Sequence, residues 1–158
     1  MDSAPISRAQ ANPSIAPVQL SFLAPKSPYM TIHIHLTFFA TSTLLFLTTT
    51  NIGESSNSAK PMGSFVYAMP DCTNPKNTIS TPLYTSPSSL DYATRTARVL
   101  AQRTSKPVYV GCSVDFSGST IEEQMEGFKK ILETVMEKWQ QKEEQKKVAN
   151  ASQGAKIA

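Results

Sequence analysis

Leu100-Ala-Gln-Arg-Thr-Ser-Lys-Pro-Val-Tyr-Val110 is the stretch on which the fold prediction depends. Pro107 has no amide proton and disfavours helical backbone at Lys106, so a helix that enters this stretch must end before it. The three residues after Pro107 (Val-Tyr-Val) are consecutive β-formers, which is typical of a strand covered on both faces. The stretch therefore predicts the end of a helix followed at once by a buried strand.

A helix is expected on each side of this stretch. Ser88 is placed as the N-cap of the first helix, and residues 119–122 (Ser-Thr-Ile-Glu) have the pattern of a capping box for the second. Apolar side chains then recur every three or four residues, which favours a helix packed on a sheet and leaves a short coiled coil as the alternative. This apolar stripe consists of Ile121, Met125, Phe128, Leu132, Val135 and Trp139.

The first half of the chain has the alternating pattern of β-strands. Residues 18–22 predict one strand, and residues 30–50 predict a hairpin with a connection at residues 40–42. A membrane segment is the alternative for this apolar region, but residues 32–47 are too few to span a bilayer and include two histidines. Residues 63–69 predict a further strand. Residues 79–85 predict an edge strand, because Pro82 cannot donate a ladder hydrogen bond.

Strands that precede helices in this order predict an α+β fold, with a mainly antiparallel β-sheet and two helices packed on it. The predicted domain covers residues 17–140. Residues 1–16 are expected to form a disordered N-terminal extension and residues 141–158 a flexible C-terminal tail, because both are poor in large apolar residues. The remaining core is large enough for one hydrophobic centre.

The composition argues against several classes of protein. The net charge of +3 comes from scattered Lys and Arg mixed with Glu, which indicates an ordinary solvated surface and no nucleic-acid partner. Cys72 and Cys112 form no CxxC motif, and no secretory leader is recognised, so free thiols in a reducing compartment are expected. We expect Cys112 to be a small core residue.

The sequence contains no recognisable catalytic or cofactor motif. His33 and His35 would lie on one face of a strand, which is how some metal sites begin, but no further histidine or carboxylate cluster accompanies them. GxSxG, Walker and GxGxxG motifs are also missing. From the residues alone, the chain is predicted to be a binding or scaffold domain without a metal or cofactor, and not an enzyme.

Four stretches, taken in order, resemble the proteasome assembly chaperone 4 family, and in particular its fungal member. Besides residues 100–110, they are Ile32-His-Ile-His-Leu36, Leu44-Leu-Phe-Leu47 leading to Asn51-Ile-Gly53, and Gly63-Ser-Phe-Val-Tyr-Ala-Met-Pro70. The resemblance covers about residues 18–140. The extended N-terminus and the Ser-rich loop at residues 55–60 depart from the shorter family pattern.

The resemblance implies a chaperone of 20S proteasome α-ring assembly. Such a subunit pairs with a proteasome assembly chaperone 3-like protein, and the pair binds an α-subunit, alpha-5, in the cytoplasm and also the nucleus. The alternative is a heterodimerising adaptor of similar build in another pathway, such as membrane trafficking. Neither reading involves a membrane-embedded segment or a nucleic acid.

The family has no motif that marks its contact residues, so candidates come from residue type. Trp139 is a candidate partner-binding anchor, because tryptophan is enriched in interface hot spots; equally, it could close the core. Arg103 and Lys106, at the bend before Pro107, are candidate polar contacts, with a solvated turn as the alternative.

Overall fold

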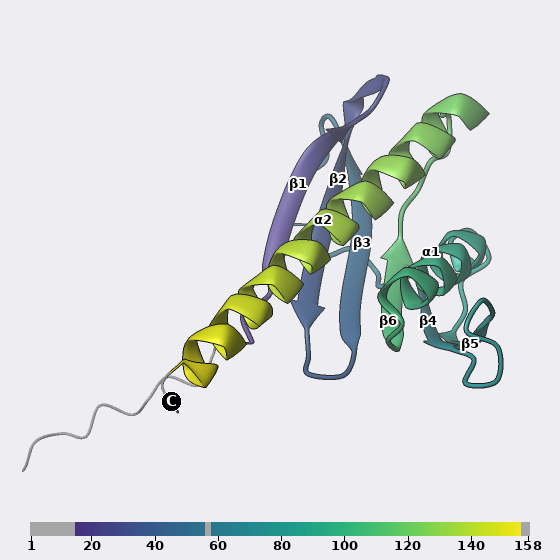
Figure 1. The fold of residues 1–158 in the computed structure, drawn as a ribbon. Coiled ribbons are helices and arrows are strands. Elements are labelled where there is room, and N and C mark those ends of the chain that lie inside the picture. Colours follow the sequence, from purple (N-terminus) through teal and green to yellow (C-terminus); the bar gives the residue numbers. More distant parts are fainter. Residues whose placement is uncertain (1–14, 56–57, 156–158) are drawn as a thin grey trace, which may run out of the picture.

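A computed structural model describes residues 15–55 and 58–155 of the chain. Within these residues it has a six-stranded, mostly antiparallel sheet and two helices, which confirms the expected α+β class (Figure 1). In chain order the elements are β1 (Val18–Ala24), β2 (Ser27–Phe38), β3 (Thr43–Asn51), β4 (Ser64–Pro70), β5 (Thr78–Tyr84), α1 (Leu90–Thr104), β6 (Val108–Ser113) and α2 (Ile121–Gly154).

The sheet has the order β1-β2-β3-β6-β4-β5. The last strand in the chain is therefore inserted between the two halves of the sheet, parallel to β3 and antiparallel to β4. All other neighbouring strands are antiparallel, and the predicted hairpin is confirmed as β2 and β3. The prediction that the strand containing Pro82 lies at an edge is also confirmed, since β5 pairs only with β4.

Both helices lie on the same face of the sheet (Figure 1). α1 packs on β4, β6 and β5, whereas α2 crosses β1 and β2. Alternate residues of β2, β3, β4 and β6 point toward the helices and are buried, as the two-residue period requires. α1 faces the sheet with small residues and Leu100, and α2 contributes Ile131, Leu132 and Val135. The opposite face of the sheet carries no helix among the described residues.

The stretch around Pro107 behaves largely as predicted. α1 ends at Thr104, and Ser105 adopts the left-handed conformation (φ 55°) that commonly terminates a helix. Val108 and Val110 are fully buried. The expectation that this strand is covered on both faces was wrong, because Tyr109 points away from the helices and is only partly buried.

Both predicted N-caps are displaced by one residue. The N-cap of α1 is Ser89, not Ser88, and its hydroxyl donates a hydrogen bond to the Ser64 hydroxyl at 3.0 Å. The capping box of α2 is formed by Thr120 and Glu123. In it the Glu123 amide donates to the Thr120 hydroxyl at 3.2 Å, and the Thr120 amide donates to the Glu123 carboxylate at 2.9 Å.

The apolar stripe of α2 is buried only in its middle. Ile121 and Met125 are 76% and 66% exposed, and Phe128 is partly buried, because the first turns of the helix project beyond the sheet. α2 also continues as a helix to Gly154, whereas the predicted domain ends at residue 140. Most of the predicted N-terminal extension (residues 1–14) lies outside the described residues, as do residues 156–158.

None of the helices in the described part of the chain is both long enough and apolar enough to cross a bilayer.

Candidate protein-binding face of the sheet

Side chains with a fixed charge are missing from the described strands of the sheet. None of the described strand residues is Asp, Glu, Lys or Arg, although such residues make up 17% of the chain. A sheet face in contact with water normally presents charged and polar side chains. Loss of charge is instead the compositional mark of the centre of a protein–protein interface. We call the side of the sheet that faces away from both helices the open face.

A row of aromatic side chains crosses the open face from β2 to β4. The ring centroids of His35 and Phe46 are 6.2 Å apart, and those of Phe46 and Phe65 are also 6.2 Å apart. The row continues from Phe65 to Tyr109 at 6.1 Å and from Tyr109 to Tyr67 at 4.8 Å. All of these side chains are only partly buried. Aromatic side chains in such a row offer a large apolar area, and they lose little conformational entropy on binding. Interface anchors have the same two properties.

The apolar surface extends to the edge of the sheet at β5. Ile79, which lies opposite Met69 in the ladder, is 53% exposed, and Tyr84, opposite Phe65, is 61% exposed. The open face therefore presents apolar side chains from its centre to this edge, and contiguous exposed patches of this kind mark interaction sites.

The two histidines occupy the other half of the open face. His33 is held between two hydroxyl groups, with 2.8 Å from Nδ1 to Ser21 Oγ and 2.8 Å from Nε2 to Thr50 Oγ1. Nδ1 of His35 and Oγ1 of Thr48 are shielded from water and have no hydrogen-bond partner. No group of three or more His, Cys, Asp or Glu side chains in the described residues could hold a metal ion, so the geometry gives no metal centre around the histidines.

Cys112 lies on the opposite, helix-covered face of β6. It is fully buried, and burial raises the pKa of its thiol to about 11. A thiol with this pKa is protonated at neutral pH, so Cys112 is an unreactive core residue, in agreement with the sequence prediction.

The three candidate contact residues lie away from the open face. Lys106 bonds Glu143 of α2 at 3.4 Å. Burial alone would raise the pKa of Glu143, but its bonds to Lys146 and Lys106 outweigh burial and lower it. Lys106 thus ties the end of α1 to α2. Trp139 is partly buried on α2. Its role as a contact residue stays a prediction.

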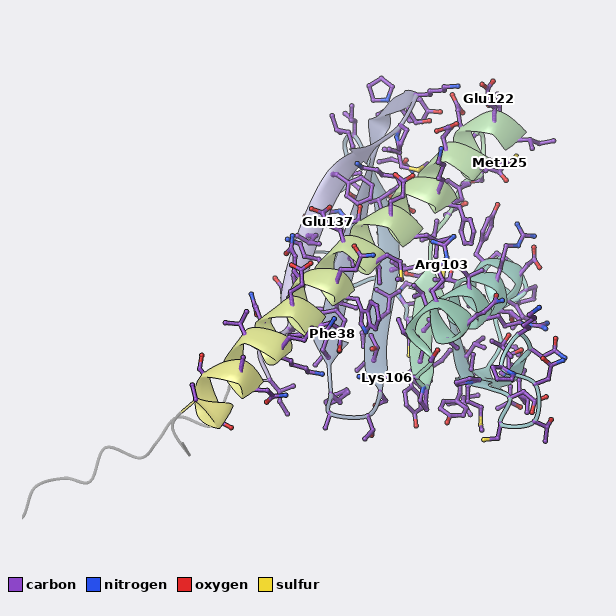
Figure 2. All side chains as sticks on the ribbon, in the orientation of Figure 1. Phe38, Arg103, Lys106, Glu122, Met125 and Glu137 are labelled. Atoms are coloured by element: carbon purple, nitrogen blue, oxygen red, sulfur yellow. The ribbon has the colours of Figure 1, made fainter. Side chains whose placement is uncertain are left out.

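Arg103 lies at the edge of a cavity of about 740 Å³ between α1 and α2. Figure 2, viewed from the helix side, shows Arg103 on α1 and Met125 near the start of α2. The apolar lining of this cavity is Tyr92, Ile121, Met125, Phe128 and Leu132. It is a second exposed surface, in the layer opposite the open face.

The aromatic row was not predicted as a site from the sequence. One signal was present in the sequence: the strand segments contain no charged residues, whereas a half-solvated strand would be expected to carry them on its outer face. Alternation alone did not distinguish the open face from a face covered by a third layer.

Comparisons with known proteins agree with this picture. The sequence model of proteasome assembly chaperone 4 matches residues 31–114, which is more than half of the chain. The chain belongs to the proteasome assembly chaperone 4 family. The match runs from Thr31, within β2, to the residue after β6, and therefore covers the aromatic row and every strand except β1 and the first four residues of β2.

A solved structure has the same fold as this proteasome assembly chaperone 4 family member. It is a chain from the crystal structure of a chaperone complex for yeast 20S proteasome assembly, and it matches with a TM-score of 0.53 and 17% sequence identity. The match covers 80% of this chain and 95% of that chain. No curated protein gives a significant match to the sequence.

Proposed function

We propose that this protein promotes assembly of the 20S proteasome α-ring as a heterodimer with a proteasome assembly chaperone 3-like subunit. Membership of the proteasome assembly chaperone 4 family supports the pathway. The observation that carries the pairing is the uncharged, aromatic open face of the sheet, which is built like an interface and has nothing covering it in the described chain. The protein then acts by binding, without catalysis.

The proposed partner packs its own sheet against the open face. Two sheets pack face to face at about 10 Å when their inner faces carry interdigitating apolar side chains. The open face meets this requirement, because its largest side chains stand in one row and none carries a fixed charge.

The proposed client is an α-subunit, alpha-5, bound through surfaces that the chaperone partner leaves uncovered. The cavity between α1 and α2 is one such surface, since Met125 and Ile121 are largely exposed there and Arg103 stands at its edge. Assembly of this kind would take place in the cytoplasm and also the nucleus.

The test is affinity capture of the tagged full-length chain, followed by mass spectrometry. A chaperone 3-like subunit and free α-subunits are expected, with little mature 20S particle. Capture of a membrane-trafficking partner in their place would favour the adaptor hypothesis, and capture of mature particles alone would contradict the proposal.

An Arg103→Glu variant separates the two proposed surfaces. It should retain the chaperone partner and lose α-subunits, because Arg103 lies on the helix side. Retention of α-subunits at the wild-type level would remove Arg103 from the client surface.

A further inference from the structure

A recess of about 300 Å³ indents the open face of the sheet. It lies over β1, β2, β3 and β6, and the connection between β3 and β4 forms one wall with residues Lys60, Pro61 and Met62. The volume is about ten times the ~30 Å³ that a water molecule occupies in the liquid. The recess can therefore hold one large side chain.

Gly111 lines the recess, and the Phe46 ring packs directly against it. A Cβ atom at Gly111 would be 2.5 Å from Cδ1 of Phe46 and 3.4 Å from Cγ of Met62. The Phe46 ring is flanked by His35 and Phe65 in the aromatic row, so it has neighbours on both sides. Any side chain at position 111 would displace this ring, so glycine lets Phe46 take the position that gives the recess its shape.

The wall formed by residues 60–62 is held in place by an ion pair. Lys60 bonds Glu54 at 2.7 Å, and the Asn51 amide donates to the same carboxylate at 3.0 Å. Lys60 and this amide lower the pKa of Glu54, which keeps it ionised at neutral pH. Among the described residues, Lys60 is the only Lys, Arg, Asp or Glu that lines the recess, and the ion pair with Glu54 neutralises its charge. Next to it, Met62 is 42% exposed, although it is a large apolar side chain.

The polar side chains that line the recess from β2 and β3 do not oppose an apolar occupant. His33 already bonds Ser21 and Thr50. Nδ1 of His35 and Oγ1 of Thr48 are shielded from water before any partner binds, so covering them removes no hydrogen bond to solvent. An occupant with a charge would have no counter-ion and would lose its own hydration.

We infer that the recess receives one bulky, uncharged side chain (Leu, Ile, Met or Phe) from a strand of the partner chaperone's sheet. Gly111, Phe46 and Met62 then determine which partner fits, because they set the depth and width of the recess. The inference rests on the proposed function, in that it assumes that the partner docks on the open face.

The test measures the affinity of full-length variants for the chaperone subunit that co-purifies with the wild-type protein. Met62→Ala removes the exposed wall and should weaken binding at least ten-fold, with the melting temperature unchanged. The matched control is Met125→Ala, the same substitution at an exposed site in the opposite layer, which should not change this affinity. Gly111→Ala should weaken binding to a similar extent in folded protein, because Phe46 must move.

Wild-type affinity in Met62→Ala would overturn the inference. Tyr67→Ala, in the aromatic row but outside the recess, then shows whether the recess assignment alone fails or the docking of the open face fails too. If Tyr67→Ala weakens binding while Met62→Ala does not, the open face docks the partner and only the recess assignment fails. If neither substitution weakens binding, the proposed docking of the open face fails as well.

Discussion

Placing one positive charge on the open face should separate binding from folding. Thr48 stands on β3 next to Phe46 in the alternation, and its hydroxyl makes no hydrogen bond in the structure. Thr48→Lys therefore removes no internal bond, and the long side chain can extend along the face so that its ammonium reaches water. The free energy of unfolding of the isolated chain should change by less than about 1 kcal/mol.

The same lysine should be severely unfavourable in the heterodimer. The strands contain no Asp or Glu to pair with it, and Glu54, beside the recess that Thr48 lines, already pairs with Lys60. An unpaired buried charge costs about 3–5 kcal/mol, and each 1.4 kcal/mol is a factor of ten in affinity. We expect the dissociation constant for the chaperone partner to rise more than a hundred-fold.

Isothermal titration calorimetry gives the affinity, and thermal unfolding gives the stability. Thr41→Lys is the matched control. Thr41 is exposed in the turn between β2 and β3, so this substitution adds the same charge outside the sheet. Wild-type affinity in Thr48→Lys would refute the reasoning, because a buried face cannot accept an unpaired ammonium at no cost. An equal loss in both variants would show that the effect comes from net charge and not from position.

Four further predictions concern the fold and its two thiols. Leu100→Ala should lower the free energy of unfolding in urea by about 2–5 kcal/mol, since the side chain is 1% exposed. Phe128→Ala should lower it by less, because Phe128 is only partly buried. A larger loss for Phe128→Ala than for Leu100→Ala would contradict the packing of α2. Thr120→Ala should cost about 1 kcal/mol in the same assay by removing the capping box, whereas no change would mean that the cap is not formed in solution. The thiol of Cys72 should react with a thiol reagent in the native protein while Cys112 reacts only after unfolding. Because the pKa of Cys112 is raised from 9.0 to about 11, its contribution to stability is fully present below pH 9 and is lost between pH 9 and 11. The loss is at most about 3 kcal/mol, and Cys112→Ala should remove this component of the pH dependence.

Local chemistry in the sequence determined where the elements lie. Pro107 forces α1 to end, whatever surrounds it, because the constraint lies in its own ring and in the backbone of the preceding residue. Pro82 similarly restricts its strand to an edge. Alternation located the hairpin, and the order of strands and helices gave the α+β class. The four family stretches were recognised from the sequence as well.

Tertiary structure decided how the elements meet and which surfaces stay free. The insertion of β6 between β3 and β4 depends on pairing between residues far apart in the chain, which local patterns do not encode. The period of the α2 stripe predicts one apolar face, yet Ile121 is exposed because the sheet does not extend beneath the first turn. Likewise, alternation shows that a strand has two different faces but not what covers each of them. Only the placement of both helices on one side revealed the open face, and with it the aromatic row and the recess beside Gly111.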